Sequence, residues 1–299
     1  MSSILSLLVA TEYRNDIKSK SFWLGTFLLP IIAVAFGFII GYLMDSSDAM
    51  KEMNKTTSPG DDLTAEQVFG MMSGVMLVIF IMIYGAQIFN KVKTEKTNRI
   101  SEVLVGSVPG HTLMISKVIS VGLIGLTQLI VWGALIAGIF ATVCVFAPVN
   151  LHITDLLNLR TLGMMLVAIA YFFGGFLFYG SLFAASGALT DRNNENQTYM
   201  TIITFVLMLS MYIGMYSTDN GTSFLTQVCF YLPFTSPAVG GVLGVSGALP
   251  WWQTLLSLLV LYGSSLFTVS IAGKIYTSAL LLKGKKFSPR DIMVFLRSR

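Results

Sequence analysis

Charged residues are scarce in this 299-residue chain: Asp, Glu, Lys and Arg together make up 11% of it, against about 25% in typical soluble domains. Hydrophobic residues make up 54%, and the mean hydropathy is +0.74. A soluble core of this length could not bury so much apolar surface. The composition therefore excludes a soluble globular protein and predicts an integral membrane protein.

Metal ligands and catalytic residue types are also few. The two histidines, His111 and His152, are isolated in the sequence and fall on opposite sides of the membrane in the topology predicted below. This leaves little material for a metal centre or an intramembrane protease. The two cysteines, Cys144 and Cys229, both fall near the predicted outer leaflet, where they are either apolar filler or a disulfide pair.

The chain has no phosphate-binding loop of the form G-x-x-x-x-G-K-[ST], so any ATP hydrolysis must come from another chain. It also has no ionisable residue inside its apolar stretches away from their ends, which disfavours an ion-coupled carrier. The first 20 residues contain a short apolar patch followed by charges rather than a cleavage site. They therefore indicate no cleavable secretory signal, and we expect the first span to remain as an anchor.

What the chain does have is long apolar runs interrupted only by small or hydroxyl residues. Runs of about 20 residues predict membrane-spanning helices, whereas a barrel strand would alternate in polarity. The predicted fold is thus all-α, with six spans in one transmembrane domain. Its segments are an amphipathic helix at 1–21, spans at 22–44, 68–89, 118–146, 161–189, 199–216 and 251–275, outer segments at 45–67 and 217–250, inner segments at 90–117 and 190–198, and a tail at 276–299.

The distribution of positive charge predicts the orientation. With the N-terminus inside, only Lys51, Lys55 and Arg160 of the 19 Lys and Arg residues fall outside. Because Lys and Arg concentrate on the cytoplasmic side of membrane proteins, both termini are predicted to be cytoplasmic. The formal net charge of +4 is explained by this asymmetry and needs no nucleic-acid partner.

Polar residues in or near the spans are the candidates for a transport pathway. They are Gln87, Gln128, Ser181 and Ser186. Hydrogen bonding between helices is the alternative role for each of them.

The inner segment 90–117 is basic and amphipathic. Glu95, Lys96, Arg99 and Glu102 recur at helical spacing, while Ile100, Val103 and Leu104 form an apolar edge. This pattern favours a cytoplasmic helix that docks on a partner protein, although a solvated helix without a partner fits it as well. On the outer side, 217–250 combines a short apolar stretch with Pro233, Pro237 and glycines, which is typical of a re-entrant or interfacial helical hairpin.

Several sequence stretches occur in an informative order along the chain. They are Tyr13-Arg-Asn-Asp-Ile-Lys-Ser-Lys20, Glu95-Lys-Thr-Asn-Arg-Ile-Ser-Glu-Val-Leu104, Ser116-Lys117 before a Gly- and Leu-rich span, Ser181-Leu-Phe-Ala-Ala-Ser-Gly-Ala-Leu189, Leu232-Pro-Phe-Thr-Ser-Pro237, and Ile275-Tyr276 through Gly284-Lys-Lys286. In these stretches the chain resembles the permease subunits of type-2 ABC exporters, in the branch typified by the NatB membrane subunit of the NatAB sodium-efflux system. Permeases of this branch commonly carry a large insertion between the first two spans, where this chain has only 45–67. The resemblance also implies that the amphipathic segment 1–21 is the connecting helix of such permeases.

The resemblance implies a non-catalytic membrane subunit that works with an ABC ATPase subunit and with a second permease copy or a sister permease. ATP and Mg²⁺ would bind to the ATPase, and no cofactor to this chain. It implies efflux, of Na⁺ or of a drug, peptide or lipid, across the bilayer of a cell membrane, a bacterial inner membrane by analogy. An ion-coupled secondary transporter is the alternative of a different class. The implied ATPase-coupling residues are Glu95, Lys96, Arg99, Ile100, Glu102 and Val103.

Overall fold

The computed structural model describes residues 2–20, 22–24, 26–27, 65–97, 109–146, 159–190 and 198–281. All regular structure in these ranges is helical and none is strand, so the all-α prediction is confirmed for them. The predicted first span at 22–44 lies almost wholly outside the described residues, as does most of the loop at 45–67. The helices are α1 (Ser2–Ile17), α4 (Ala65–Thr97), α6 (Gly110–Phe146), α8 (Leu159–Leu189), α9 (Thr198–Ser217), α10 (Phe224–Tyr231), α11 (Ser236–Ser246) and α12 (Trp251–Leu281).

Five helices are long and apolar enough to cross a membrane: α4, α6, α8, α9 and α12. The short helices α10 and α11 form a sixth candidate only if they count together, and they meet at an angle of 109°. This bent pair occupies most of the range 217–250 in which a hairpin was predicted. The residues that the structure describes thus provide five to six candidate spans.

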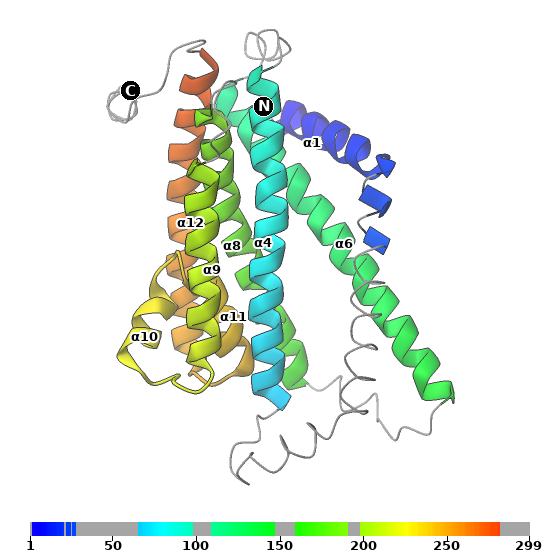
Figure 1. Cartoon of the computed structure of the whole chain (residues 1–299), viewed down its shortest axis with the longest axis vertical. Helices are drawn as coiled ribbons and strands as arrows, with labels where there is room; N and C mark the ends of the chain where they lie inside the picture. Colours follow the sequence, from blue (N-terminus) through cyan, green and yellow to red (C-terminus); the bar gives the residue numbers. More distant parts are fainter. Residues whose placement is uncertain are drawn as a thin grey trace.

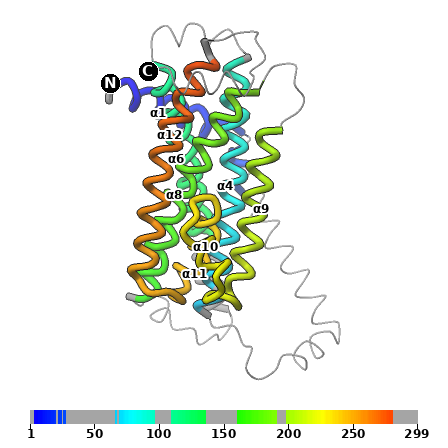
Figure 2. The backbone as a smooth tube through the Cα atoms, turned by 90° about the vertical axis from the view of Figure 1, so that its left-hand side faces the viewer, coloured from blue at the N-terminus to red at the C-terminus, as the bar shows by residue number. Residues whose placement is uncertain are grey.

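The long helices form a bundle with distinct ends. Helices α4, α8, α9 and α12 run side by side, whereas α6 leans away from α4 toward its C-terminal end (Figure 1). Helix α1 crosses one end of the bundle, which we call the α1 end, and α10 and α11 lie at the other, the bent-pair end (Figure 2). Helix α8 packs on both α4 and α12 and so occupies the centre.

Two helices extend beyond the apolar runs that predicted them. Helix α4 continues to Thr97, through Lys91 and Lys96, because these lysines reach partners on neighbouring segments while their aliphatic stems stay against the bundle. Helix α6 begins at Gly110, where the carbonyl of Pro109 accepts a bond from the backbone N–H of Thr112 at 2.9 Å. Proline here opens a helix, as its fixed φ favours.

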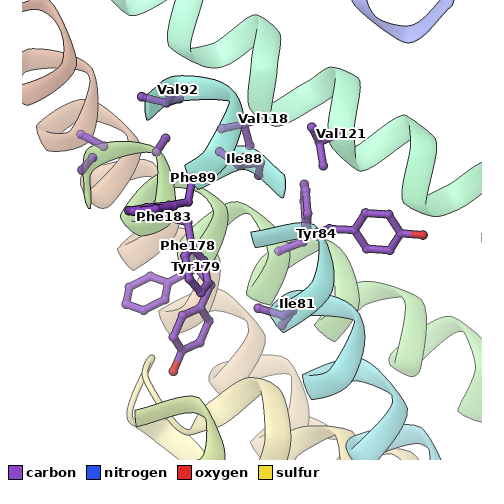
Figure 3. Close-up of a cluster of buried hydrophobic side chains, with 14 of the residues drawn as sticks. Ile81, Tyr84, Ile88, Phe89, Val92, Val118, Val121, Phe178, Tyr179 and Phe183 are labelled. Carbon is purple, nitrogen blue, oxygen red and sulfur yellow. The ribbon is translucent and has the colours of Figure 1, made fainter. Parts of the chain in front are cut away.

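Aromatic and aliphatic side chains fill the seam between α4 and α8. Figure 3 shows Ile88 and Phe89 of α4 beside Phe183 of α8, with Val118 of α6 closing the third side. Gly187 permits the close approach: a Cβ there would lie 2.7 Å from the carbonyl oxygen of Phe89. The seam places the end of α4 firmly against the end of α8.

Helix α11 is buried along its whole length among the spans. It contacts α4 at two glycines, and a Cβ at Gly70 would lie 2.5 Å from the carbonyl oxygen of Val242. Gly247 ends the helix with φ of +69°, a conformation that glycine adopts without strain. The bent pair is therefore part of the core at its end of the bundle.

Candidate functional site

A buried lysine joins four helices at the α1 end. Lys117 of α6 is only 3% exposed, and its Nζ contacts Glu12 of α1 at 3.0 Å and forms a second ion pair with Glu95 of α4. Ser120 donates to the other oxygen of Glu12 at 2.8 Å, and Tyr276 of α12 donates to Glu95 at 3.2 Å. We call these five residues the Lys117 network. A buried ammonium needs this many partners, since an unpaired charge is costly away from water.

A further ion pair, outside the Lys117 network, joins Asp16 of α1 to Lys91 of α4. Asp16 follows Glu12 by one helical turn, so both carboxylates lie on the side of α1 that contacts the bundle. Arg14 and Lys18 instead line a shallow groove on α1 together with Leu7 and Thr11. Helix α1 is therefore divided by charge, with carboxylates toward the bundle and cations elsewhere.

The two described residues of the predicted coupling set contact this chain's own helices. Glu95 belongs to the Lys117 network, and Lys96 donates to the carbonyls of Ala188 at 2.8 Å and Thr190 at 3.3 Å. A cation at these carbonyls satisfies the C-terminal end of α8 and complements its dipole. The other four, Arg99, Ile100, Glu102 and Val103, lie outside the described residues.

A chain of hydrogen bonds connects α4, α6 and the segment after α1. The hydroxyl of Tyr84 donates to the side-chain carbonyl of Gln128, whose amide donates to Oγ1 of Thr26 at 2.8 Å. The indole of Trp132 donates to the backbone carbonyl of Thr26, also at 2.8 Å. Tyr84 and Gln128 are buried and Trp132 half-buried, so these bonds satisfy polar groups that the bilayer could not.

Beside these bonds lies a cavity of about 290 Å³, which we call the Gln87 cavity. It brings together two of the four predicted pathway residues, Gln87 and Gln128. Its lining residues are Asp16, Ser19, Phe22, Phe80, Ile83, Tyr84, Gln87, Ile124, Gln128 and Trp132.

The other two predicted pathway residues lie apart from this cavity. Ser181 and Ser186 are buried in α8, and each hydroxyl donates to a carbonyl three residues earlier in the same helix, Phe178 and Phe183, at 2.8 Å. Neither side chain lines the Gln87 cavity. Their bonds satisfy the hydroxyl groups within α8 itself.

At the bent-pair end, side chains satisfy the carbonyls that the break between α10 and α11 leaves without helical partners. Thr235 donates to Cys229 at 2.6 Å, Ser257 of α12 to Phe230 at 2.7 Å, and Tyr179 of α8 to Phe234. The Cys229 thiol is free and buried. Irregular backbone at membrane depth is stable only where protein groups replace water in this way.

Sequence reasoning missed several residues of the site. It placed Lys117 at the end of the inner segment 90–117 and Glu12 in an amphipathic helix, and it did not single out Tyr84. The spacing of Glu12 and Asp16 by four residues was the available signal, because it places both on one face. Their partners are about 75 and 105 residues away, which local pattern does not reveal.

A family model described as "ABC-2 family transporter protein" matches residues 49–274. Among curated proteins, the chain is 25% identical over 236 residues to "Uncharacterized protein YhaP" of Bacillus subtilis, covering 77% of this chain and 56% of that protein. It is 23% identical over 195 residues to "Uncharacterized protein MJ1024" of Methanocaldococcus jannaschii, covering 65% and 45%. The chain thus spans about half the length of these relatives. No solved structure matches it.

Proposed function

Since the chain belongs to the ABC-2 transporter family, we propose that it is the permease subunit of an ATP-driven ABC exporter. The observation that supports this most directly is the Lys117 network. Through Glu95, one of the predicted coupling residues, it joins the end of α4 to α1, α6 and α12. A partner that moves the segment after Thr97 would move these helices together.

The mechanism follows from these contacts. An ATPase subunit binds ATP and Mg²⁺, and its closure displaces the predicted coupling segment that contains Arg99 and Glu102. Helix α4 transmits the displacement through Glu95 to Lys117 and through Lys96 to the end of α8. Transport then requires two packings of the bundle that differ in cargo affinity, because a bound cargo can shift the equilibrium only by that difference. The permease itself carries out no chemistry.

The proposed orientation places the α1 end in the cytoplasm. The described Lys and Arg residues gather there, including Lys91, Lys93 and Lys274, while Arg160 lies at the bent-pair end beside Glu66. This asymmetry is the one expected of an inner surface. The bent pair is then a re-entrant hairpin on the outer side. Two permeases, identical or sister chains, complete the exporter in the cell membrane.

The cargo is the least constrained part of the proposal. Sodium efflux rests on the resemblance to the NatB-like branch. Within the described spans the only carboxylate is Glu95, which is already paired with Lys117. A cavity with aromatic walls and amide groups is better suited to an amphipathic organic cargo than to a small hydrated ion. We therefore favour a drug-like or lipid-like cargo.

Co-purification tests the ATPase partnership. The tagged chain is isolated in mild detergent and the accompanying proteins are quantified, with charge reversals at Arg99 and Glu102 as variants. Glu95 is unsuitable for reversal because Lys117 depends on it. Lys274→Glu is the control, since Lys274 is exposed on α12.

We expect a phosphate-binding-loop ATPase in stoichiometric amounts with the wild-type and Lys274→Glu chains, and its loss in the Arg99 and Glu102 variants. A folded wild-type chain that recovers no ATPase would contradict the proposal and favour an ion-coupled secondary transporter.

A further inference from the structure

We propose that the Gln87 cavity binds the cargo, and that this cargo is an amphiphile with a cationic amine head and an aromatic or apolar body. The cargo role rests on the function proposed above, but the binding site itself does not. Four features of the cavity support it: its walls, one amide without a partner, the balance of charge around it and its accessibility.

The walls are formed by matching rows on two antiparallel helices. Phe80, Tyr84 and Gln87 on α4 face Ile124, Gln128 and Trp132 on α6. The rings of Phe80 and Trp132 meet edge to face with centroids 5.3 Å apart at the deep end. Each row spans roughly 10–12 Å at 1.5 Å per residue, enough for one ring system and a short chain. Aromatic faces attract ammonium groups as well as apolar bodies.

Gln87 offers the hydrogen bonds that a ligand would use. The groups of Gln128 and Tyr84 are bonded to each other, and Gln128 also donates to Thr26. Among the described residues no partner is found for the half-buried Gln87 amide, which lines the cavity. A polar group at this depth is costly unless something bonds to it. A ligand head at Gln87 would supply the missing partner.

The charge beside the cavity favours a cation. Three carboxylates, Glu12, Asp16 and Glu95, face two ammonium groups, Lys91 and Lys117, where α1 meets α4 and α6. These five ion-paired groups sum to one net negative charge. Asp16 stands at the cavity itself, and only one of its oxygens is engaged by Lys91. A ligand ammonium can therefore bind at the same carboxylate.

The cavity is accessible from outside the bundle. Two of its lining residues, Ser19 just after α1 and Ile83 on α4, are exposed. In the proposed orientation this opening lies near the inner membrane surface. An amphiphile that partitions into the inner leaflet would already have its head at the level of Asp16 and its body at the level of Phe80.

Binding is tested with the full chain in lipid nanodiscs by isothermal titration calorimetry. The probes are benzylammonium and phenylmethanesulfonate, a cation whose head carries N–H donors and an anion on the same benzyl body. We expect the cation to bind and the anion not to. Gln87→Leu should weaken cation binding about fivefold or more, the usual effect of one lost hydrogen bond. Gln227→Leu is the matched control, because Gln227 is an exposed residue of α10, and it should leave the affinity unchanged.

A further variant separates ligand binding from general damage to the fold. Lys91→Met removes the ammonium that competes with the ligand for Asp16. The affinity for the cation should therefore rise by about threefold or more, which is the size expected for one partly exposed charge pair. A structural defect would lower it. Equal binding of the anion, no binding of the cation, or unchanged affinity in Gln87→Leu would overturn the proposal.

The two proposals fail separately. Cation binding by a chain that recovers no ATPase would support the site and contradict the exporter. An ATPase complex whose permease does not bind the cation would support the exporter and overturn the site.

Discussion

At the scale of single residues, Lys117 is the side chain on which the α1 end depends most. It is nearly inaccessible and holds two carboxylates from different helices. Replacing it by methionine keeps the length of the side chain but leaves Glu12 and Glu95 facing each other without a counter-charge. We expect Lys117→Met to destabilise the protein by about 3 kcal/mol. Thermal unfolding of the purified chain in detergent measures the loss.

The control for that substitution is Lys274→Met, on the exposed face of α12 at the same end. It should change the unfolding temperature little, because exposed charges contribute little to stability. Equal stability of the two variants would contradict the structural role of the Lys117 network.

At the bent-pair end, Ser257 also stabilises the contact between helices. Its hydroxyl donates to the carbonyl of Phe230 at 2.7 Å and lies 2.9 Å from the hydroxyl of Ser236, all of them buried. Ser257→Ala should cost about 1–3 kcal/mol, since it leaves a buried carbonyl without its partner. Ser270→Ala, which removes an exposed bond within one helix, should cost less than about 0.5 kcal/mol. Denaturant-dependent unfolding of both variants compares them, and equal losses would contradict this assignment.

At the scale of elements, the contact between α4 and α11 depends on glycine. A Cβ at Gly70 would lie 2.5 Å from a backbone oxygen of α11, so the helices must separate to admit it. Gly70→Ala should destabilise the protein by about 1–3 kcal/mol. Gly133→Ala on α6 meets nothing within 4 Å and should be neutral or stabilising by up to about 1 kcal/mol. Thermal unfolding distinguishes the two, and a stable Gly70→Ala variant would contradict the packing.

The helical elements were largely predictable, because an apolar run of about 20 residues has few alternatives in a bilayer. Helix ends were less so. The run that predicted a span at 68–89 contains no information about Lys96, whose position is set by the carbonyls of Ala188 and Thr190 from another helix. Pro233 and Pro237 signalled the break in 217–250. The angle of 109° between its two helices depends on partners in α8 and α12.

At the scale of the whole molecule, the proposed orientation is testable with two cysteines in a chain that lacks Cys144 and Cys229. The substitutions are Asn15→Cys and Thr222→Cys. Asn15 is exposed on α1, and Thr222 is exposed between α9 and α10. We expect a membrane-impermeant maleimide to label position 222 in intact cells and position 15 only after the membrane is opened. The reverse pattern would invert the orientation and place the Lys117 network outside.

Only part of the candidate site could be predicted, because some of its residues stand out in the local sequence and others matter only through the arrangement of distant segments. Gln87 and Gln128 stand out because amides are rare in apolar runs, and they line one cavity. Glu12, Asp16 and Lys91 do not stand out, since charges at the ends of spans are ordinary. Their importance arises because α1 packs on α6 (Figure 1) and brings Asp16 to Lys91 of α4, an arrangement of segments that no single stretch of sequence specifies.

The break between α10 and α11 also has a consequence for biosynthesis. The carbonyl of Phe230 accepts a hydrogen bond from Ser257, which is made 27 residues later. Ser73 of α4 donates to the carbonyl of Gly241 at 2.7 Å, and Tyr179 of α8 donates to that of Phe234. Both of these donors already exist when the bent pair leaves the ribosome. The pair can therefore join α4 and α8 early, but it becomes fully bonded only when α12 is inserted. A chain that is stopped before Trp251 would hold an exposed carbonyl in the membrane, a state that quality-control proteases can recognise.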